Sequence, residues 1–550
     1  MKAAGRGNDQ LKLHEAVARN LSDHDVDLLF GLIGDANLYL VDAYSRLPGC
    51  RFMPATHEAL AMQMALGYAQ VTGRIGVATV THGAALANTV TALIEGVKSS
   101  VPVVLLAGDT PAEDLEHLQK IGQKELIAAT GAGFVPLRGA ATYAEDVGTA
   151  FRRAAVERRP IVLNMPSNQQ WDDVEYRLVR HKLPDLRMIV PESSDLDEAI
   201  GIIAAARSPV ILAGRGAAGP QARNALKRLA DRIGAPLMTT LRGRDLFKGE
   251  SHALGIFGTL SAPEGVEAIA ASDCVIAFGA SLNRFTTSKG DLLKKKRVVQ
   301  VDIDAAAIGR HIMPDAGLVG DAALTADLFM RWLDEAEIPG SGFRDGPLAD
   351  RLAAIPTISS TPRNGPETVD LPTALTALND AIPEDRLVTT DAGRFLRYAW
   401  AAFPVPAPQS FIFTVAIGSI GLGLGHAIGA AAGSPGRTSV LIAGDGGLML
   451  SGLTELHTAV ASRLDLVVIV CNDGSYGAEH VQFVERGMDP SLSLFDWPDF
   501  ATVARAMGAD AVTVAGEDGL SAAIKAIGSR NKPLLIDLKL DPDAIVSMRR

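Results

Sequence analysis

Two apolar segments that end in glycine-rich, acidic turns constrain the fold of this chain most strongly. Residues 440–443 are followed by Gly444-Asp445-Gly446-Gly447, and residues 466–471 are followed by Asn472-Asp473-Gly474. Short apolar runs of this kind predict buried parallel strands, and the segment between them has helical spacing. A right-handed crossover would make the two strands neighbours. We therefore expect both turns to meet at the carboxyl edge of one α/β sheet.

The residue types in these turns are suited to a metal-bound diphosphate. Asp445 supplies a carboxylate, and Asn472 or Asp473 supplies a second oxygen ligand, which is what Mg²⁺ prefers. Gly446 and Gly447 allow the backbone to approach a diphosphate, and the helix that follows presents its positive end. A single Gly-Asp-Gly also occurs in ordinary turns, but Asn-Asp at the end of a second apolar run makes the pattern specific.

This pattern resembles the signature of thiamine-diphosphate enzymes, in which Gly-Asp-Gly is followed by Asn-Asn. The resemblance covers nearly the whole chain and is closest to the group of acetohydroxyacid synthase, pyruvate oxidase, benzoylformate decarboxylase and 2-hydroxyacyl-CoA lyase. In this family the second Asn binds the metal. Counting from Asp445 selects Asn472 here, whereas aligning Gly474–Gly477 with the family's Gly-Thr-Tyr-Gly selects Asp473, with the backbone carbonyl of Ser475 as a further ligand.

Glu58 is the strongest candidate for a catalytic residue. His57-Glu58 precedes a Gly-Tyr-Ala-x-x-Thr-Gly segment at 67–73 and a glycine-containing turn that ends in Asn88, as in the family. The resemblance implies that Glu58 hydrogen-bonds N1′ of the aminopyrimidine and stabilises the imino form that accepts the proton from thiazolium C2. This role requires an apolar site in which desolvation raises the pKa of the carboxyl. The alternative is an acid that only opens a helix.

Further segments resemble the family's cofactor-binding loops. Residues 390–394 resemble its first diphosphate loop, although Asp391 could instead be a helix cap. Residues 418–421 resemble the turn that bends thiamine, with Ile420 as the wedge between the rings and the Gly418 carbonyl as acceptor. The residues that the resemblance assigns to cofactor binding are Glu58, Asn88, Gly393, Arg394, Gly418, Ser419, Ile420, Gly444, Gly446, Gly447, Ser475, Tyr476 and Gly477.

Four residues are candidates for the substrate side of the site. His82 lies where carboligating relatives often carry a small residue. A helix N-terminus would lower its pKa and suit a proton shuttle, or the histidine only shapes the turn. Gln123 lies where relatives carry a Gln that faces the cofactor, so it is a second catalytic candidate. Glu479 and His480 follow the metal loop and are expected to line the substrate pocket, or to be solvated helix residues.

Buried strands alternating with helical patterns predict an α/β protein with three consecutive domains, each built on a mainly parallel sheet. By resemblance, residues 1–185 bind the pyrimidine, residues 195–340 form a central domain, and residues 371–550 bind the diphosphate and Mg²⁺. The first and third domains are expected to share one plan, and residues 338–370 to form a linker. The predicted strands are 76–80, 101–107, 160–163, 209–213, 236–239, 274–278, 298–301, 387–390, 440–443, 466–470 and 534–538.

The composition limits which kinds of molecule the chain is expected to bind and where it is expected to be found. A hydrophobic content of 47% with 21% charged residues is typical of soluble globular proteins, and a net charge of −11 argues against nucleic acid. Three dispersed cysteines favour a reducing cytoplasm, and residues 1–16 contain no apolar signal segment. The glycine-rich run 417–433 is a poor membrane span, so no membrane partner is expected. Gly214-Arg215-Gly216 could admit FAD or ADP, but an essential nucleotide is not expected because the fingerprint is incomplete.

The sequence therefore predicts a thiamine-diphosphate- and Mg²⁺-dependent enzyme that cleaves or forms a C–C bond next to a carbonyl. The first interpretation is a non-oxidative 2-oxo acid decarboxylase or carboligase similar to acetolactate synthase, acting on a small molecule. A 2-hydroxyacyl-CoA lyase, another thiamine-dependent lyase or acyltransferase, and a non-catalytic scaffold are alternatives. The resemblance also implies a homodimer or homotetramer with sites shared between chains. The substrate, the reaction type and the oligomeric state remain open at this point.

Overall fold

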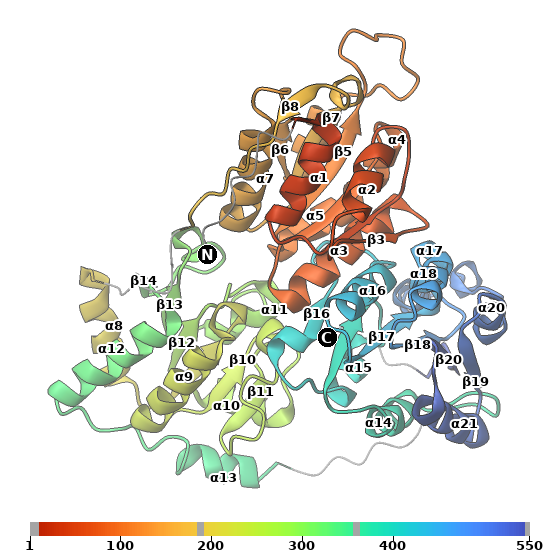
Figure 1. Ribbon diagram of the computed structural model, residues 1–550. Coiled ribbons are helices and arrows are strands. Elements are labelled where there is room, and N and C mark those ends of the chain that lie inside the picture. Colours follow the sequence, from red (N-terminus) through yellow and green to blue (C-terminus); the bar gives the residue numbers. More distant parts are fainter. Residues whose placement is uncertain (1–9, 184–191, 356–363, 545–550) are drawn as a thin grey trace. The chain divides into compact units, whose positions relative to one another are not determined.

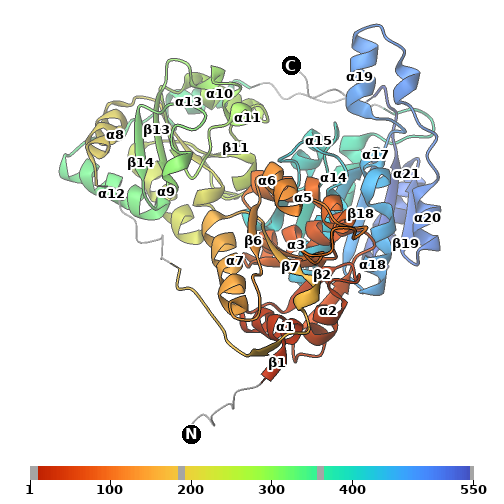
Figure 2. The same ribbon diagram turned by 90° about the horizontal axis from the view of Figure 1, so that it is seen from above.

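The computed structural model describes residues 10–183, 192–355 and 364–544 (Figures 1 and 2). Three six-stranded parallel sheets and one antiparallel pair, β1 (Gln10–Lys12) with β8 (Asp173–Glu175), form its framework. The chain divides into two compact units. One contains the first and third sheets, and the other contains the middle sheet together with residues 404–409. The predicted class, three α/β domains with parallel sheets, is confirmed.

The first sheet has the order β3-β2-β4-β5-β7-β6. Its strands are β2 (Leu28–Gly31), β3 (Arg51–Pro54), β4 (Gly76–Val80), β5 (Val103–Asp109), β6 (Gly133–Pro136) and β7 (Ile161–Pro166). Its helices are α1 (Leu13–Asp23), α2 (Leu38–Ser45), α3 (Glu58–Thr72), α4 (Ala84–Asn88), α5 (Val90–Ser99), α6 (Gln123–Thr130) and α7 (Tyr143–Glu157). Helices cover both faces of the sheet, so its central strands are buried on both sides.

The third sheet repeats this plan. Its order is β16-β15-β17-β18-β20-β19, so strands taken in chain order occupy the same places as in the first sheet. The strands are β15 (Arg386–Thr390), β16 (Phe411–Phe413), β17 (Thr438–Gly444), β18 (Leu466–Asn472), β19 (Asp510–Val514) and β20 (Leu534–Lys539). The helices are α14 (Leu371–Ala381), α15 (Leu396–Ala402), α16 (Gly423–Gly433), α17 (Asp445–Ser451), α18 (Leu456–Ala461), α19 (Gly477–Glu485), α20 (Phe500–Ala506) and α21 (Glu517–Ser529). The predicted likeness of the first and third domains is confirmed.

The middle sheet has a different order, β11-β10-β9-β12-β13-β14, which is that of doubly wound nucleotide-binding sheets. Its strands are β9 (Pro209–Ala213), β10 (Leu237–Thr239), β11 (Ala253–Ile256), β12 (Cys274–Phe278), β13 (Arg297–Asp302) and β14 (Ala316–Val319). Its helices are α8 (Ser194–Ala205), α9 (Pro220–Ile233), α10 (Pro263–Ala271), α11 (Arg284–Thr287), α12 (Ala322–Glu335) and α13 (Pro347–Ala353). Helix α13 corrects the predicted linker at 338–370, because Leu348 and Phe343 are buried in this unit's core.

Every strand predicted from an apolar run is present, whereas the strands at the sheet edges were not predicted. The missed strands are β3 and β6 in the first sheet, β11 and β14 in the second, β16 and β19 in the third, and β1 and β8 of the antiparallel pair, together with the short inner strand β2. An edge strand has one neighbour and needs less continuous apolar sequence, so its pattern is weaker. β17 and β18 pair in parallel, with Val440 opposite Val467, so the two turns of the metal motif do meet at one edge.

Helices α3 and α16 lie side by side in the first unit and connect its two sheets (Figure 1). A Cβ atom on Gly67 would lie 2.0 Å from the carbonyl oxygen of His426, and one on Gly429 would lie 1.9 Å from that of Met64. The two backbones therefore touch, and only glycine fits at these positions. The contacts of Gly425 with Gln63 and of Gly433 with Thr72 show that the helices run in the same direction.

Replacing Gly429 with Ala should force the helices apart and lower the free energy of unfolding by about 2–3 kcal/mol, the range typical of an overpacked core. The matched control is Gly528→Ala on α21, where a Cβ meets no atom within 4 Å. There alanine should raise stability by about 0.5–1 kcal/mol, because glycine is the weaker helix former. Chemical denaturation of both variants checks this. Equal stability of the two variants would contradict the backbone contact.

His426 gives this interface a pH dependence. The side chain is fully buried on α16, and desolvation lowers its pKa to about 4 from an ordinary value of 6.5. The unfolded chain therefore binds a proton at higher pH than the folded chain does. The contribution of His426 to stability is complete above pH 6.5 and is lost as the pH falls from about 6.5 towards about 4.

We expect His426→Gln to remove this dependence. Between pH 7 and pH 4 the unfolding free energy of the wild type should fall by about 3 kcal/mol more than that of the variant, since each pKa unit corresponds to about 1.4 kcal/mol. Paired denaturant titrations at several pH values measure the difference. Parallel pH profiles for the two proteins would show that His426 is not the responsible group.

Candidate active site

Asp445 lies at the carboxyl end of β17 as the first residue of α17, and its side chain is 2% exposed. Its Oδ2 atom is buried and has no hydrogen-bond partner among the described residues. Burial raises the pKa of Asp445 to about 7, and the negative charge of Asp473 acts in the same direction. An unpartnered carboxylate oxygen beside a second acid is an arrangement that a cation would stabilise.

Both candidates for the second metal ligand are hydrogen-bonded within the fold. The Asn472 side chain donates to Asp537 Oδ1 at 2.9 Å and accepts from the backbone N–H of Gly474. Asp473 carries a negative charge that, after burial, raises the pKa of Asp445. Which of the two residues binds a metal stays a prediction.

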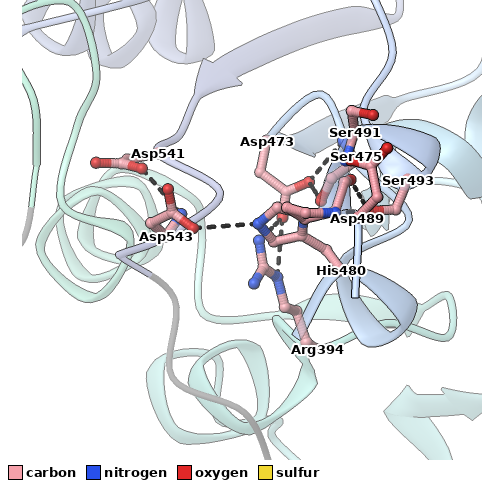
Figure 3. A network of polar contacts seen from close by, with 10 residues as sticks. Arg394, Asp473, Ser475, His480, Asp489, Ser491, Ser493, Asp541 and Asp543 are labelled. Atoms are coloured by element: carbon pink, nitrogen blue, oxygen red, sulfur yellow. Dashed lines mark hydrogen bonds and ion pairs between the residues drawn. The ribbon is translucent and has the colours of Figure 1, made fainter. Parts of the chain in front are cut away.

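Asp473 belongs to a polar network that Figure 3 shows from close by. Its Oδ2 atom accepts from Arg394 Nε at 3.0 Å and Nη2 at 2.7 Å, and its Oδ1 atom accepts from the backbone N–H and hydroxyl of Ser475. His480 is buried, with its ring nitrogens 3.1 Å from Ser493 Oγ and from Asp543 Oδ1. His480 is therefore not a solvated helix residue, whereas its neighbour Glu479 is exposed.

The glycines of the turn after β17 are required by close packing. A Cβ on Gly446 would lie 2.6 Å from the Tyr476 ring, and one on Gly447 would lie 2.9 Å from Asp391 Oδ2. Asp391 accepts from the backbone N–H of Gly421, and burial raises its pKa to about 6. Asp391 therefore holds the 418–421 turn in place beside Gly447 and does not cap a helix of its own segment.

That turn carries the residues predicted to contact the thiamine rings. Gly418 is exposed with φ of +80°, and Ile420 is half-buried with its carbonyl accepting from the Ser419 hydroxyl. Two backbone N–H groups just before it, those of Ala416 and Ile417, donate to the fully buried carboxylate of Glu95 on α5. The turn is thus fixed from both sheets of the first unit.

Glu58 is the first residue of α3, and the ring of His57 before it accepts the backbone N–H of Ala59. The carboxylate does more than begin the helix, because Asn88 Nδ2 at the end of α4 donates to Glu58 Oε2 at 2.9 Å. Glu58 is half-buried and Asn88 is exposed within the single chain. The structure therefore brings together the two residues of the predicted pyrimidine site that belong to the first sheet.

His82 and Gln123 lie at the carboxyl edge of the first sheet. The His82 ring is buried, its Nδ1 atom has no partner among the described residues, and burial lowers its pKa, with His117 as the second cause. The direction is the expected one, but it arises from burial and a second imidazole and not from a helix. The His117 ring lies edge-on, with centroids 5.0 Å apart. His117 was missed because it lies in a loop without periodicity or a motif.

The side chain of Gln123 hydrogen-bonds to several neighbouring segments of the first sheet's domain. Its Oε1 atom accepts the backbone N–H of Gly83 at 2.8 Å, and its Nε2 atom donates to the Gly108 carbonyl and to Asn164. These bonds join α6, the turn before α4, and strands β5 and β7. In the described structure Gln123 therefore supports the turn that carries His82.

The donor set fits a diphosphate-bound Mg²⁺. Asp445 contributes an unpartnered buried oxygen, and the Asp473 carboxylate and Ser475 lie on the adjacent loop. No group of three or more His, Cys, Asp or Glu side chains with metal-binding geometry occurs in residues 10–183, 192–355 and 364–544. Mg²⁺ is commonly bound by one or two carboxylates together with phosphate oxygens and waters, which is compatible with Asp445 and Asp473.

In the middle unit the loops after β9 and β12 meet at the point where the strand order reverses. A Cβ on Gly214 would lie 2.1 Å from the Gly279 carbonyl oxygen, and one on Gly216 would lie 2.8 Å from Gly279 Cα. Close packing of the two loops is sufficient to require these glycines. That FAD or ADP is not essential here stays a prediction.

Within the described part of the chain, none of the helices combines the length and the apolar character that a membrane crossing requires.

Comparison with known proteins gives consistent matches along the chain. The models of the thiamine pyrophosphate enzyme N-terminal, central and C-terminal domains match residues 11–128, 196–329 and 391–538. A probable acetolactate synthase large subunit from Methanococcus aeolicus is 25% identical, covering 97% of this chain and 93% of its own length. A sulfoacetaldehyde acetyltransferase from Castellaniella defragrans is 28% identical, covering 94% and 91%. The acetolactate synthase of Mycobacterium bovis is 28% identical, covering 98% and 89%.

The position of Gln123 generates a stability prediction. Gln123→Ala should lower the free energy of unfolding by about 2–4 kcal/mol, because buried groups at Gly83, Gly108 and Asn164 lose partners at about 1–3 kcal/mol each. Gln123→Glu keeps one acceptor, loses both donated bonds and should also destabilise. Denaturant unfolding measures both variants. Wild-type stability in Gln123→Ala would show that these bonds contribute nothing.

Proposed function

The chain belongs to the thiamine-diphosphate-dependent enzymes, and from this premise we propose that it is a Mg²⁺-dependent, non-oxidative 2-oxo acid decarboxylase or carboligase resembling acetolactate synthase. The observation that carries the metal and diphosphate part of the proposal is the buried, unpartnered Oδ2 atom of Asp445 beside Asp473. The acetolactate synthases among its relatives support the reaction class, since they align over almost the whole chain.

The metal in this proposal is held by Asp445, Asp473 and the backbone carbonyl of Ser475. Asp473 is preferred over Asn472 because it carries a full negative charge that acts on Asp445. The diphosphate lies against the backbone at Gly446 and Gly447 and against the segments at 393–394 and 475–477. Mg²⁺ neutralises the charge of the two carboxylates and the phosphates together.

When bound, thiamine diphosphate would supply a nucleophilic carbon and a sink for the electrons of a C–C bond next to a carbonyl. Glu58 holds a proton at the pyrimidine nitrogen N1′, and Asn88 orients the Glu58 carboxylate through the bond between them. Ile420 and the Gly418 carbonyl hold the pyrimidine over the reacting ring. His82, buried and with a lowered pKa, moves a proton at the substrate oxygen. His480 and Glu479 lie on the metal loop's helix and face the substrate.

Two copies of the chain complete each site in this proposal. Glu58 is half-buried and Asn88 exposed in one chain, whereas the role of Glu58 requires an apolar enclosure. Apolar side chains beside both half-sites are exposed: Leu115 and Leu118 near His117, and Met449 and Leu450 on α17. A homodimer, or a tetramer of two such dimers, would cover them.

The unpaired cysteines support a reducing cytoplasm as the compartment.

A second candidate function is acyl transfer or 2-hydroxyacyl-CoA cleavage. The sulfoacetaldehyde acetyltransferases among the relatives are as similar to this chain as the acetolactate synthases are. A non-catalytic scaffold is the third candidate, and the retained Glu58, Asn88 and Asp445 argue against it.

The reaction class is tested by measuring CO₂ release from pyruvate and from branched, aromatic and guanidino 2-oxo acids, with thiamine diphosphate and Mg²⁺ added to stripped enzyme. Cofactor-dependent release is expected, and product analysis separates an aldehyde from a hydroxyketone. Binding of the cofactor without release from any acid would favour acyl-CoA or sulfonated aldehyde substrates and reject the first proposal.

Glu58→Gln should abolish turnover, with a loss of at least roughly 100-fold, the scale typical of removing a proton-transfer group. Binding of thiamine diphosphate should change little, as measured by calorimetry in the presence of Mg²⁺. The matched control is Glu517→Gln, which changes an acid in the first turn of α21 away from the site. Turnover by Glu58→Gln near the wild-type rate would show that the mechanism is wrong.

A further inference from the structure

The roles proposed above for Arg394 and Asp473 do not explain why the two side chains form an ion pair. Arg394 follows β15 and Asp473 follows β18, and β17 lies between these strands in the sheet. The two residues therefore follow the strands on either side of β17, and Asp445 follows β17 itself. Figure 3 shows the contact between the Arg394 and Asp473 side chains. The Arg394 and Asp473 side chains are only 5% and 7% exposed. This is a buried charge pair within a site that must also accept a charged ligand.

Asp473 accepts four hydrogen bonds from protein donors. Its Oδ2 atom receives two bonds from Arg394, and its Oδ1 atom receives the N–H of Ser475 at 3.0 Å and the Ser475 hydroxyl at 2.6 Å. The loop glycine Gly477 makes room for the arginine, because a Cβ there would lie 2.3 Å from Arg394 Nε. The chain therefore accommodates the guanidinium through a second position that has to be glycine.

One hydrogen-bond donor of Arg394 has no acceptor among the described residues. Its Nη1 atom is buried and has no hydrogen-bond partner in the described residues. A buried N–H of a charged group without an acceptor is costly, so a free guanidinium nitrogen inside a site indicates a missing acceptor. A phosphate oxygen is the acceptor that a guanidinium binds best, since it can hold its carboxylate and a phosphate at the same time.

The charge of the loop explains why this arginine is needed. Asp473 is a second carboxylate in a site that already holds Asp445, and its negative charge would repel the diphosphate. Arg394 adds one positive charge in direct contact with Asp473. The net charge of the Arg394–Asp473 pair is then zero, as it would be for two neutral side chains.

We propose that Arg394 and Asp473 form a charge-compensated unit in which Arg394 neutralises the extra carboxylate and donates its free Nη1 to the terminal phosphate of the diphosphate. The inference rests on the proposed metal and diphosphate site. In this unit the effect of each residue on cofactor binding depends on the other residue. Loss of Arg394 leaves a buried carboxylate facing the diphosphate, and loss of both residues restores a neutral loop.

The test is a double-mutant cycle on cofactor binding, with the full chain as wild type, Arg394→Met, Asp473→Asn and the double variant. The readout is the dissociation constant of thiamine diphosphate at saturating Mg²⁺, measured by calorimetry, with Mg-pyrophosphate as a second probe that lacks the thiamine rings. Arg394→Met should weaken binding of both probes by roughly 100-fold, in the range seen when one member of a desolvated charge pair is removed. The double variant should recover to within about tenfold of the wild type.

Arg530→Met is the control, because Arg530 forms an ion pair of similar length with Asp465, at 2.6 Å, in the same domain but before β18, with Asp465 46% exposed. It should bind both probes as the wild type does. Arg394→Lys keeps the positive charge but lacks the planar guanidinium group. Its dissociation constants should lie between those of the wild type and those of Arg394→Met. It replaces Arg394→Met in the cycle if circular dichroism shows that the latter is unfolded.

The outcomes separate this inference from the proposed function. If the wild type binds neither probe, the metal and diphosphate site itself is wrong and the inference falls with it. If the wild type binds and the arginine variants bind equally well, or if the double variant binds no better than Arg394→Met, the site stands and the coupling is overturned.

Discussion

The direct contact between the backbones of α3 and α16 is the constraint on which the first unit depends. Gly67 and Gly429 leave no side chain between the two helices, so the first and third sheets are held through a rigid pair of helices that run in the same direction. Helix α3 begins at Glu58, and α16 begins two residues after the 418–421 turn. The packing that joins the domains therefore also fixes where both of these site segments start.

Further buried polar contacts strengthen this arrangement. The Glu95 carboxylate accepts two backbone N–H groups just before the 418–421 turn, and Asp391 accepts that of Gly421 at its end. The Glu455 carboxylate accepts the backbone N–H and hydroxyl of Thr56, close to Glu58. Loops usually move more than the elements they connect. Here carboxylates from neighbouring elements accept backbone N–H groups of the loops, which restrains the loops of the site.

The edge of the third sheet shows how a protein concentrates charge in a buried site. Burial, and after it the charge of Asp473, raises the pKa of Asp445, and Arg394 offsets only part of the charge of the two carboxylates. The two carboxylates repel each other, and a bound cation would remove this repulsion. Such a site therefore favours the binding of a cation. On the first sheet the strategy is different. His82 and His117 are kept near each other, and burial favours the neutral form of His82.

The sequence by itself determined all inner strands except β2, the α/β class, the repeated plan of the first and third domains, and the acidic, glycine-rich turns after β17 and β18. These features depend on local properties: continuous apolar runs, glycines in turns, and acids next to strand ends. It could not determine the edge strands, because strands with one neighbour need less apolar sequence. Only the tertiary structure placed Asn472 against Asp537 and Asp473 beside Asp445, bonded Asn88 to Glu58, gave Gln123 its three partners, and brought His117 to His82. Each of these contacts joins residues from different elements, and the direction of a side chain at a strand end is set by neighbours that sequence spacing does not specify.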